Sequence, residues 1–193
     1  MRKIHWCCVG MLAMYAGGSA TAHAGETIEN DLYKHWARFK PGSYCKMKSV
    51  SKVMGQTTES TMTTTLKSVT KDRIVLEVVS ATRSGGREFK MPPQKIEHLA
   101  RIPKPKPGEI KKQKGKKLDV KPKEGKEEMS VKGKKIKTKW SESTIKMGKT
   151  TTRSKTWMSE DIPGQIVKTV TTTEGEMKMV TEMTLVDFKA IMK

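Results

Sequence analysis

Hydrophobic and polar positions alternate along most of this chain, which is the pattern of antiparallel strands with one covered face. Ile74, Leu76 and Val78 point one way, while Arg73 and Glu77 point the other. Near the C-terminus a second apolar face comprises Met177, Met179, Met183 and Leu185. Threonine-rich runs at 61–65, 150–152 and 171–173 suit a half-exposed pleated surface.

Turn residues divide these alternating runs at 70–72, 84–86, 163–164 and 174–175. We therefore predict a mainly β fold with a single twisted antiparallel sheet of the open-barrel kind. Met54-Gly55-Gln56-Thr57-Thr58 also aligns with Met147-Gly148-Lys149-Thr150-Thr151. This alignment raises the alternative that the sheet consists of two repeated three-stranded meanders.

One helix is predicted before the first long strand, over residues 26–39. Ile28, Leu32, Trp36 and Phe39 recur at helical spacing on one face. Lys40-Pro41-Gly42 then ends the helix. We expect the aromatic face of this helix to pack on the sheet.

Residues 1–24 have the pattern of a cleavable signal peptide. Arg2 and Lys3 precede an apolar run at 6–16, and Ala22-His23-Ala24 provides small residues at a cleavage site. The apolar run is shorter than the ~20 residues that span a bilayer. The sequence thus predicts export to the periplasm, the cell envelope or the extracellular space, with no transmembrane segment after cleavage. Residues 25–193 then form a single domain.

The charge is concentrated in residues 103–126, which contain ten lysines and four prolines. Such composition predicts a disordered linker between the two halves of the domain. The formal net charge of +19 favours acidic partners, of which nucleic acid is the least favoured for an exported protein. The linker is either a solvated spacer or a polybasic contact to acidic envelope polymers, formed by Lys111, Lys112, Lys114, Lys116 and Lys117.

Catalytic and metal motifs are missing from the sequence. After the predicted signal peptide the chain has two histidines, His35 and His98, and one cysteine, Cys45, without the spacing of a zinc site or a nucleophile elbow. We therefore expect no enzyme activity, no cofactor and no metal. A Cys45–His98 nucleophile pair and Cu(I) bound by the C-terminal methionines are alternatives that no neighbouring residue supports.

Three stretches resemble other exported bacterial proteins of uncharacterised function: 36–44, 131–140 and 157–168. The third, with Trp157-Met158-Ser159 followed by Pro163-Gly164 before a strand, also resembles the lipoprotein-carrier half-barrel superfamily. The resemblance implies an antiparallel sheet curled around a helix, with a concave face that can receive acyl chains. It transfers no site residue.

These observations predict a non-enzymatic binding protein of the periplasm or envelope. Its ligand would be a lipid, a lipoprotein or another hydrophobic anionic molecule, held by apolar side chains of the concave face with lysines at the rim. The candidate ligand-binding residues are Met177, Met179, Met183, Leu185 and Trp157. The alternative is a structural or interaction protein that the polybasic linker holds to acidic envelope polymers.

Overall fold

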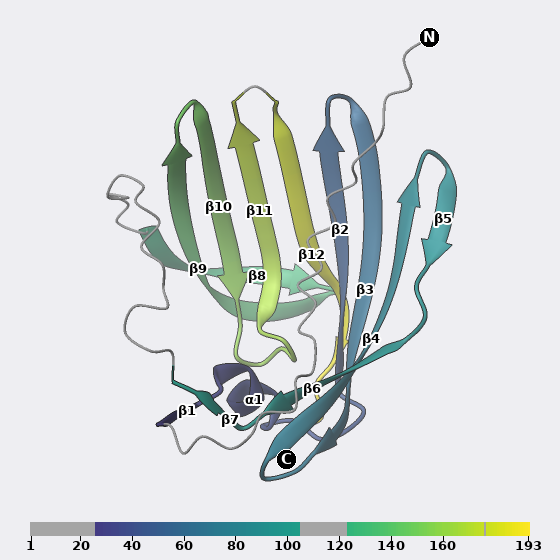
Figure 1. Ribbon diagram of the computed structural model, residues 1–193, viewed down its shortest axis with the longest axis vertical. Helices are drawn as coiled ribbons and strands as arrows, with labels where there is room; N and C mark the ends of the chain where they lie inside the picture. The colour runs from purple at the N-terminus through teal and green to yellow at the C-terminus, as the bar shows by residue number, and fades with distance from the viewer. Residues whose placement is uncertain (1–25, 105–122, 176) are drawn as a thin grey trace.

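Antiparallel strands make up most of the structure, a computed structural model that describes residues 26–104, 123–175 and 177–193 (Figure 1). The predicted signal peptide and the five lysines of the predicted polybasic contact lie outside these residues. The elements are β1 (Thr27–Glu29), α1 (Asp31–Trp36), β2 (Tyr44–Val53), β3 (Gln56–Val69), β4 (Arg73–Ser84), β5 (Arg87–Lys90), β6 (Gln94–Leu99), β7 (Arg101–Pro103), β8 (Lys123–Val131), β9 (Lys134–Met147), β10 (Thr150–Met158), β11 (Ile166–Glu174) and β12 (Met179–Lys189).

One large sheet contains ten of these strands, in the order β5-β4-β3-β2-β12-β11-β10-β9-β8, with β6 also paired to β4. β5 pairs with the last residues of β4, and β6 pairs with its first residues. The sheet is open, because β8 at one edge does not pair with β5 or β6 at the other. The predicted fold class, a single open antiparallel sheet, is confirmed.

The sheet has two faces, which the strand register defines, because paired residues point to the same side. We call the side that bears Cys45 and Met47 the helix face, since Cys45 lies next to Trp36 at the end of α1. The opposite side is called the charged face. The helix-face side chains of β4 include Ile74, Leu76 and Val78, as the alternation predicts.

Helix α1 is shorter than the predicted helix over 26–39. Asn30 caps it, because its side chain accepts hydrogen bonds from the backbone N–H groups of Leu32 and Tyr33. Residues before Asn30 instead form β1, which pairs with β7 and leaves Ile28 39% exposed. A β-branched Thr-Ile pair close to another strand favours that extended conformation over one more helical turn.

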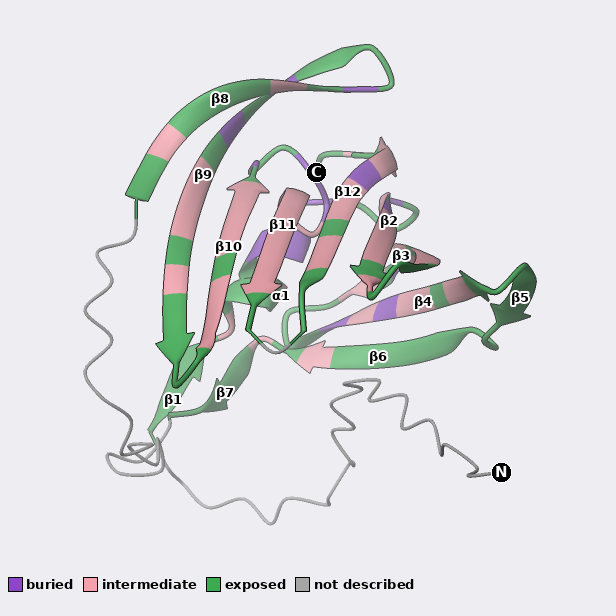
Figure 2. Cartoon of the chain, turned by 90° about the horizontal axis from the view of Figure 1, so that it is seen from above, coloured by how far each residue is buried: buried purple, intermediate pink, exposed green. Residues whose placement is uncertain are grey.

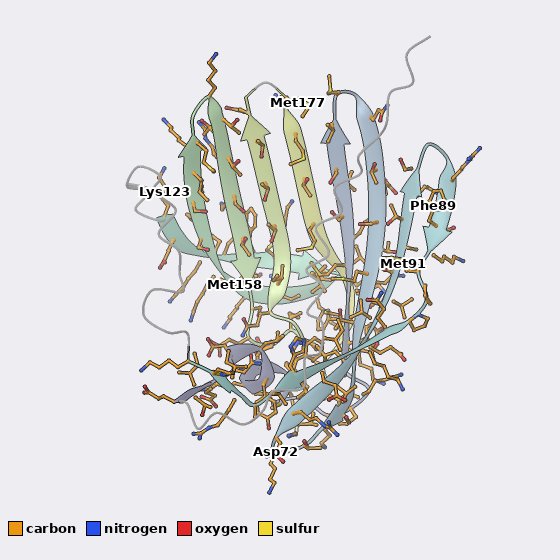
Figure 3. All side chains as sticks on the ribbon, viewed as in Figure 1. Asp72, Phe89, Met91, Lys123, Met158 and Met177 are labelled. Atoms are coloured by element: carbon orange, nitrogen blue, oxygen red, sulfur yellow. The ribbon has the colours of Figure 1, made fainter. Side chains whose placement is uncertain are left out.

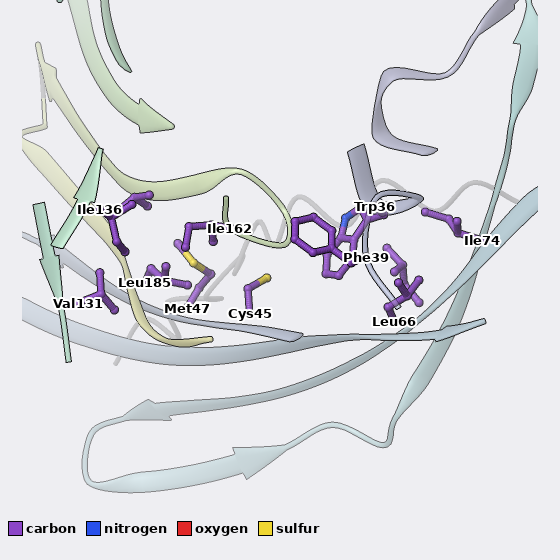
Figure 4. Close-up of a cluster of buried hydrophobic side chains, with 12 residues drawn as sticks. Trp36, Phe39, Cys45, Met47, Leu66, Ile74, Val131, Ile136, Ile162 and Leu185 are labelled. Carbon is purple, nitrogen blue, oxygen red and sulfur yellow. The ribbon is translucent and has the colours of Figure 1, made fainter. Parts of the chain in front are cut away.

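The core lies where α1 meets the lower ends of the strands (Figure 4). Trp36 and Phe39 are almost fully buried, and their rings meet edge to face with 6.5 Å between centroids. Figure 2 shows the same distribution, with buried residues near α1 and exposed ones on β5 and much of β8. The other members of the core are Cys45, Met47, Leu66, Ile74, Leu76, Val131, Ile136, Ile162, Val167 and Leu185.

Two three-stranded meanders are present, β2-β3-β4 and β9-β10-β11, but their turns do not follow the predicted alignment. Met54-Gly55 forms the β2–β3 turn, whereas Gly148-Lys149 forms the β9–β10 turn. Matching the two Met-Gly pairs is therefore one residue out of step with the strands. Because side chains alternate between the two faces of the sheet, a shift of one residue aligns each residue with one that points to the other face.

The boundaries of the predicted linker are ordered. Pro103 belongs to β7, and β8 begins at Lys123, so 123–126 form strand pairs with β9. Residues 105–122 of the predicted linker lie outside the described residues.

Candidate binding surface

The loop between β10 and β11 closes the lower part of the helix face. Ile162 of this loop is buried, and its carbonyl oxygen accepts a hydrogen bond from Nε2 of the buried His35 at 2.8 Å. Burial lowers the pKa of His35 below its ordinary value, which favours the neutral ring where it meets the loop. Helix and loop together cover only the lower strand ends.

Above this covered part, every described helix-face side chain from β9 across to β4 is uncharged. The strand register places there Ser141, Ser143, Ile145, Met147, Thr150, Thr152, Ser154, Thr156, Thr169, Thr171, Thr173, Met179, Thr181, Met183, Ser49, Ser51, Val53, Gln56, Thr58, Ser60, Met62, Val78, Ser80, Thr82 and Ser84. We call this set the uncharged upper face. Its size is unusual in a chain with a formal net charge of +19.

Hydroxyl groups on the uncharged upper face bind one another across neighbouring strands. Ser51 and Thr181 lie 3.0 Å apart between their side-chain oxygens, joining β2 to β12. Three further pairs join β10 to β11: Thr152–Thr173, Ser154–Thr171 and Thr156–Thr169, at 3.2, 3.2 and 3.4 Å. A threonine whose hydroxyl is paired in this way can turn its methyl group to a ligand. The surface is therefore less polar than its composition implies.

The charged face has the opposite character. Ion pairs join neighbouring strands there, Lys48 to Glu59 at 3.1 Å and Lys168 to Glu182 at 2.7 Å. The Lys168 ammonium holds the pKa of Glu182 below its ordinary value. Above the covered part, alternation thus confines the ionic groups of these strands to the charged face, which also carries threonines such as Thr61 and Thr172.

The five predicted ligand-binding residues do not form one site. Met179, Met183 and Leu185 share the helix face, with Leu185 buried in the core and the two methionines above it. Met177 precedes β12 and lies in the turn after β11.

Trp157 points to the charged face instead, since it pairs with Trp140 and Lys168. The Lys155 ammonium lies 4.1 and 4.6 Å from the Trp140 and Trp157 ring centroids. The indole N–H of Trp157 donates to Glu127 at 2.8 Å. Trp157 therefore belongs to a cation–aromatic cluster and not to the methionine surface.

A groove of about 770 Å³ lies between the β8–β9 hairpin and the β10–β11 loop. Its lining consists of Lys126, Glu127, Glu128, Lys137, Thr138, Lys139, Met158, Ser159, Glu160, Asp161 and Gln165. An apolar ligand in this groove would remove water from carboxylates and ammonium groups, which is costly. The groove therefore suits a strongly polar occupant, in contrast to the uncharged upper face.

The imagined Cys45–His98 pair is not assembled. β3 and β4 lie between β2, which carries Cys45, and β6, which carries His98, so the strands are about 14 Å apart. Burial raises the pKa of the Cys45 thiol to about 11, which keeps it protonated and inert at neutral pH. In the described residues, no three His, Cys, Asp or Glu side chains gather as metal ligands.

No protein-family model, curated protein or solved structure matches this chain. Among the helices of the described ranges, none is long and apolar enough to cross a bilayer.

Proposed function

We propose that this chain is a non-enzymatic binding protein of the cell envelope that holds the acyl chain of a lipid or lipoprotein on its uncharged upper face. The observation that carries the proposal is the extent of that face. It continues over seven neighbouring strands beyond the part that α1 covers, without a charged side chain among the described residues.

An acyl chain fits this surface for two physical reasons. No ionic group of the uncharged upper face would lose its hydration when the acyl chain binds, because charged residues at that level, such as Lys48 and Lys168, point to the charged face. Lys139 of β9 shares the side of Ser141 but lies below it, beside the charged groove. The paired hydroxyls keep their hydrogen bonds under an apolar ligand, so burying them costs little.

Methionine side chains supply the adaptable apolar contacts. Met62, Met179 and Met183 lie on β3 and β12 of the uncharged upper face, and Met62 is 40% exposed. Flexible, polarisable thioethers conform to ligands of varied shape. The resemblance of 157–168 to the lipoprotein-carrier superfamily supports the same class of ligand.

A sugar ligand is less well supported. Sugar binding uses free hydrogen-bonding groups and aromatic rings, but many hydroxyls of the uncharged upper face already bind each other. The two tryptophans of β9 and β10 lie on the opposite side of the sheet.

The test uses neighbouring positions of β3 that face opposite ways. Met62→Glu places a carboxylate on the uncharged upper face, whereas Thr61→Glu places one on the charged face. We expect Met62→Glu to weaken binding of a fluorescent fatty-acid probe at least about tenfold, because an acyl contact would desolvate the new charge. Thr61→Glu should bind like the unmodified protein.

Native mass spectrometry of the protein purified from its own envelope fraction provides a second readout. Adducts of lipid mass that disappear on denaturation, and that Met62→Glu lacks, support the proposal. A clean protein mass together with no probe binding by the unmodified protein would exclude it.

A further inference from the structure

The most exposed large apolar side chains of the described residues gather at one end of the sheet. Met54 is 78% exposed, Met147 67%, Phe89 59% and Met177 58%. Each lies in or beside a strand connection, where a large apolar side chain gains no burial within the fold. Isolated exposed apolar residues are ordinary, but several that are the most exposed of the described large apolar residues and share one end indicate a contact surface.

The topology places these residues at the same end. In an antiparallel meander every second turn lies at the same end of the strands. The β2–β3, β4–β5, β9–β10 and β11–β12 turns therefore lie at one end of the sheet. The β3–β4 turn lies at the other end, and Figure 3 shows Met177 and Asp72 at opposite ends of the sheet. Met54 and Met177 are neighbours there, since both line one hollow of about 550 Å³ with Lys52 and Lys178.

Basic residues accompany the exposed methionines. Lys52, Lys146, Lys149, Lys178 and Arg87 all lie within two residues of one of these turns. Within the same distance of these turns, the sequence has three acidic residues, Glu88, Glu174 and Glu176. The end of the sheet therefore combines protruding apolar side chains with an excess of positive charge. We call Met54, Met147, Met177, Lys52, Lys149 and Lys178 the rim.

We propose that the rim docks the protein on the surface of an anionic lipid bilayer. The methionine side chains enter the boundary between headgroups and acyl chains, and the lysines meet lipid phosphates. A bilayer fits better than a protein pocket, because the exposed methionine side chains come from several turns spread across one end of the sheet. Contact with an extended surface requires such a distribution. This inference goes beyond the proposed function, since docking needs no ligand on the uncharged upper face.

The first test removes the apolar protrusions. The variant combines Met54→Asn, Met147→Ser and Met177→Ser; asparagine is used because Met54 has a φ of 48°, which asparagine tolerates. The control, Met158→Ser with Met192→Ser, alters exposed methionines away from the rim. Binding to phosphatidylcholine vesicles that contain phosphatidylglycerol should weaken at least about tenfold for the rim variant and stay unchanged for the control.

The second test removes the charge. Lys52→Gln, Lys149→Gln and Lys178→Gln should each weaken vesicle binding by about fivefold and flatten its salt dependence. Lys71→Gln and Lys189→Gln, away from the rim, serve as controls. Thermal unfolding monitored by circular dichroism must show that all variants fold like the unmodified protein.

Equal binding by rim and control variants, or equal binding to vesicles of phosphatidylcholine alone, would overturn the proposal. Failure here is distinct from failure of the proposed function. Met62→Glu lies away from the rim turns and should keep vesicle binding even where it loses the fatty-acid probe.

Discussion

At the scale of single residues, Cys45 shows how deeply the lower helix face is buried. The residue is 7% exposed, and its Sγ would lie 3.1 Å from a Cβ atom added at Gly164, beside Trp36. Burial raises its pKa from the ordinary value of 9.0 to about 11. Above the ordinary value the unfolded chain loses this proton while the folded chain keeps it, so the free energy of unfolding falls as pH rises from about 9 to about 11.

Replacement of Cys45 by alanine should remove this part of the alkaline destabilisation. Relative to Cys45→Ala, the unmodified protein should lose about 1 kcal/mol of stability between about pH 8 and about pH 10. Urea unfolding at both pH values measures the difference. An identical pH dependence of the two proteins would show that the thiol ionises as freely as in the unfolded chain.

Position 125 needs a glycine because a neighbouring side chain leaves no room for a Cβ atom, and not because its backbone has a positive φ. A Cβ atom at this position would lie 2.6 Å from Cε2 and Cζ2 of Trp140 on the paired strand. We expect Gly125→Ala to lower the free energy of unfolding by about 1–3 kcal/mol, because the indole must move from its place beside Lys155.

A double-mutant cycle identifies the cause. In a Trp140→Ala background, Gly125→Ala should cost almost nothing, since the clash is gone. Urea unfolding of the four proteins gives the coupling energy. An equal cost in both backgrounds would assign the effect to the strand backbone instead.

At the scale of elements, the β8–β9 hairpin is held at its tip. Val131 and Ile136 are buried in the core, Lys132 forms an ion pair with Asp187 at 2.9 Å, and the Lys134 ammonium lies 5.4 Å from the Phe188 ring centroid. The tip therefore contacts the lower end of β12, although β9, β10 and β11 lie between β8 and β12 in the sheet.

The apolar contacts should dominate this attachment. Ile136→Ala should lower the free energy of unfolding by about 2–4 kcal/mol, because it leaves a cavity in the core. Lys132→Ala should cost less than about 1 kcal/mol, because that ion pair is exposed to solvent. Chemical denaturation compares the two, and a larger loss for Lys132→Ala would contradict this ranking.

Alternation predicted the strands well but not the extent of the helix. Period-two patterns depend only on neighbouring residues, so β4 and β12 were visible in the sequence. The start of α1 depends on β7, a strand more than sixty residues further along, which pairs with residues that local spacing assigned to a helix. The internal alignment was one residue out of step, since a shared Met-Gly pair does not specify the type of turn.

At the scale of the whole molecule, the fold class could be predicted from the sequence. The residues of the candidate surface could be predicted only in part. Met179 and Met183 were assigned to one face correctly, because both lie in a single strand. Trp157 was grouped with them, but its face depends on the register of β10 against β11, which the sequence of neither strand reveals. The serine and threonine pairs were missed for the same reason, although the spacing of Thr169, Thr171 and Thr173 was a usable signal.

The open edges of the sheet have a mechanical consequence. In a closed barrel, strand number and stagger fix the diameter, and a wider ligand can enter only if backbone hydrogen bonds break. Here β8 and β5 do not pair with each other, so small changes of twist between neighbouring strands can widen or narrow the curvature with every ladder intact. Above the hairpin tip that is attached to β12, the width of the curved sheet can therefore change at little elastic cost.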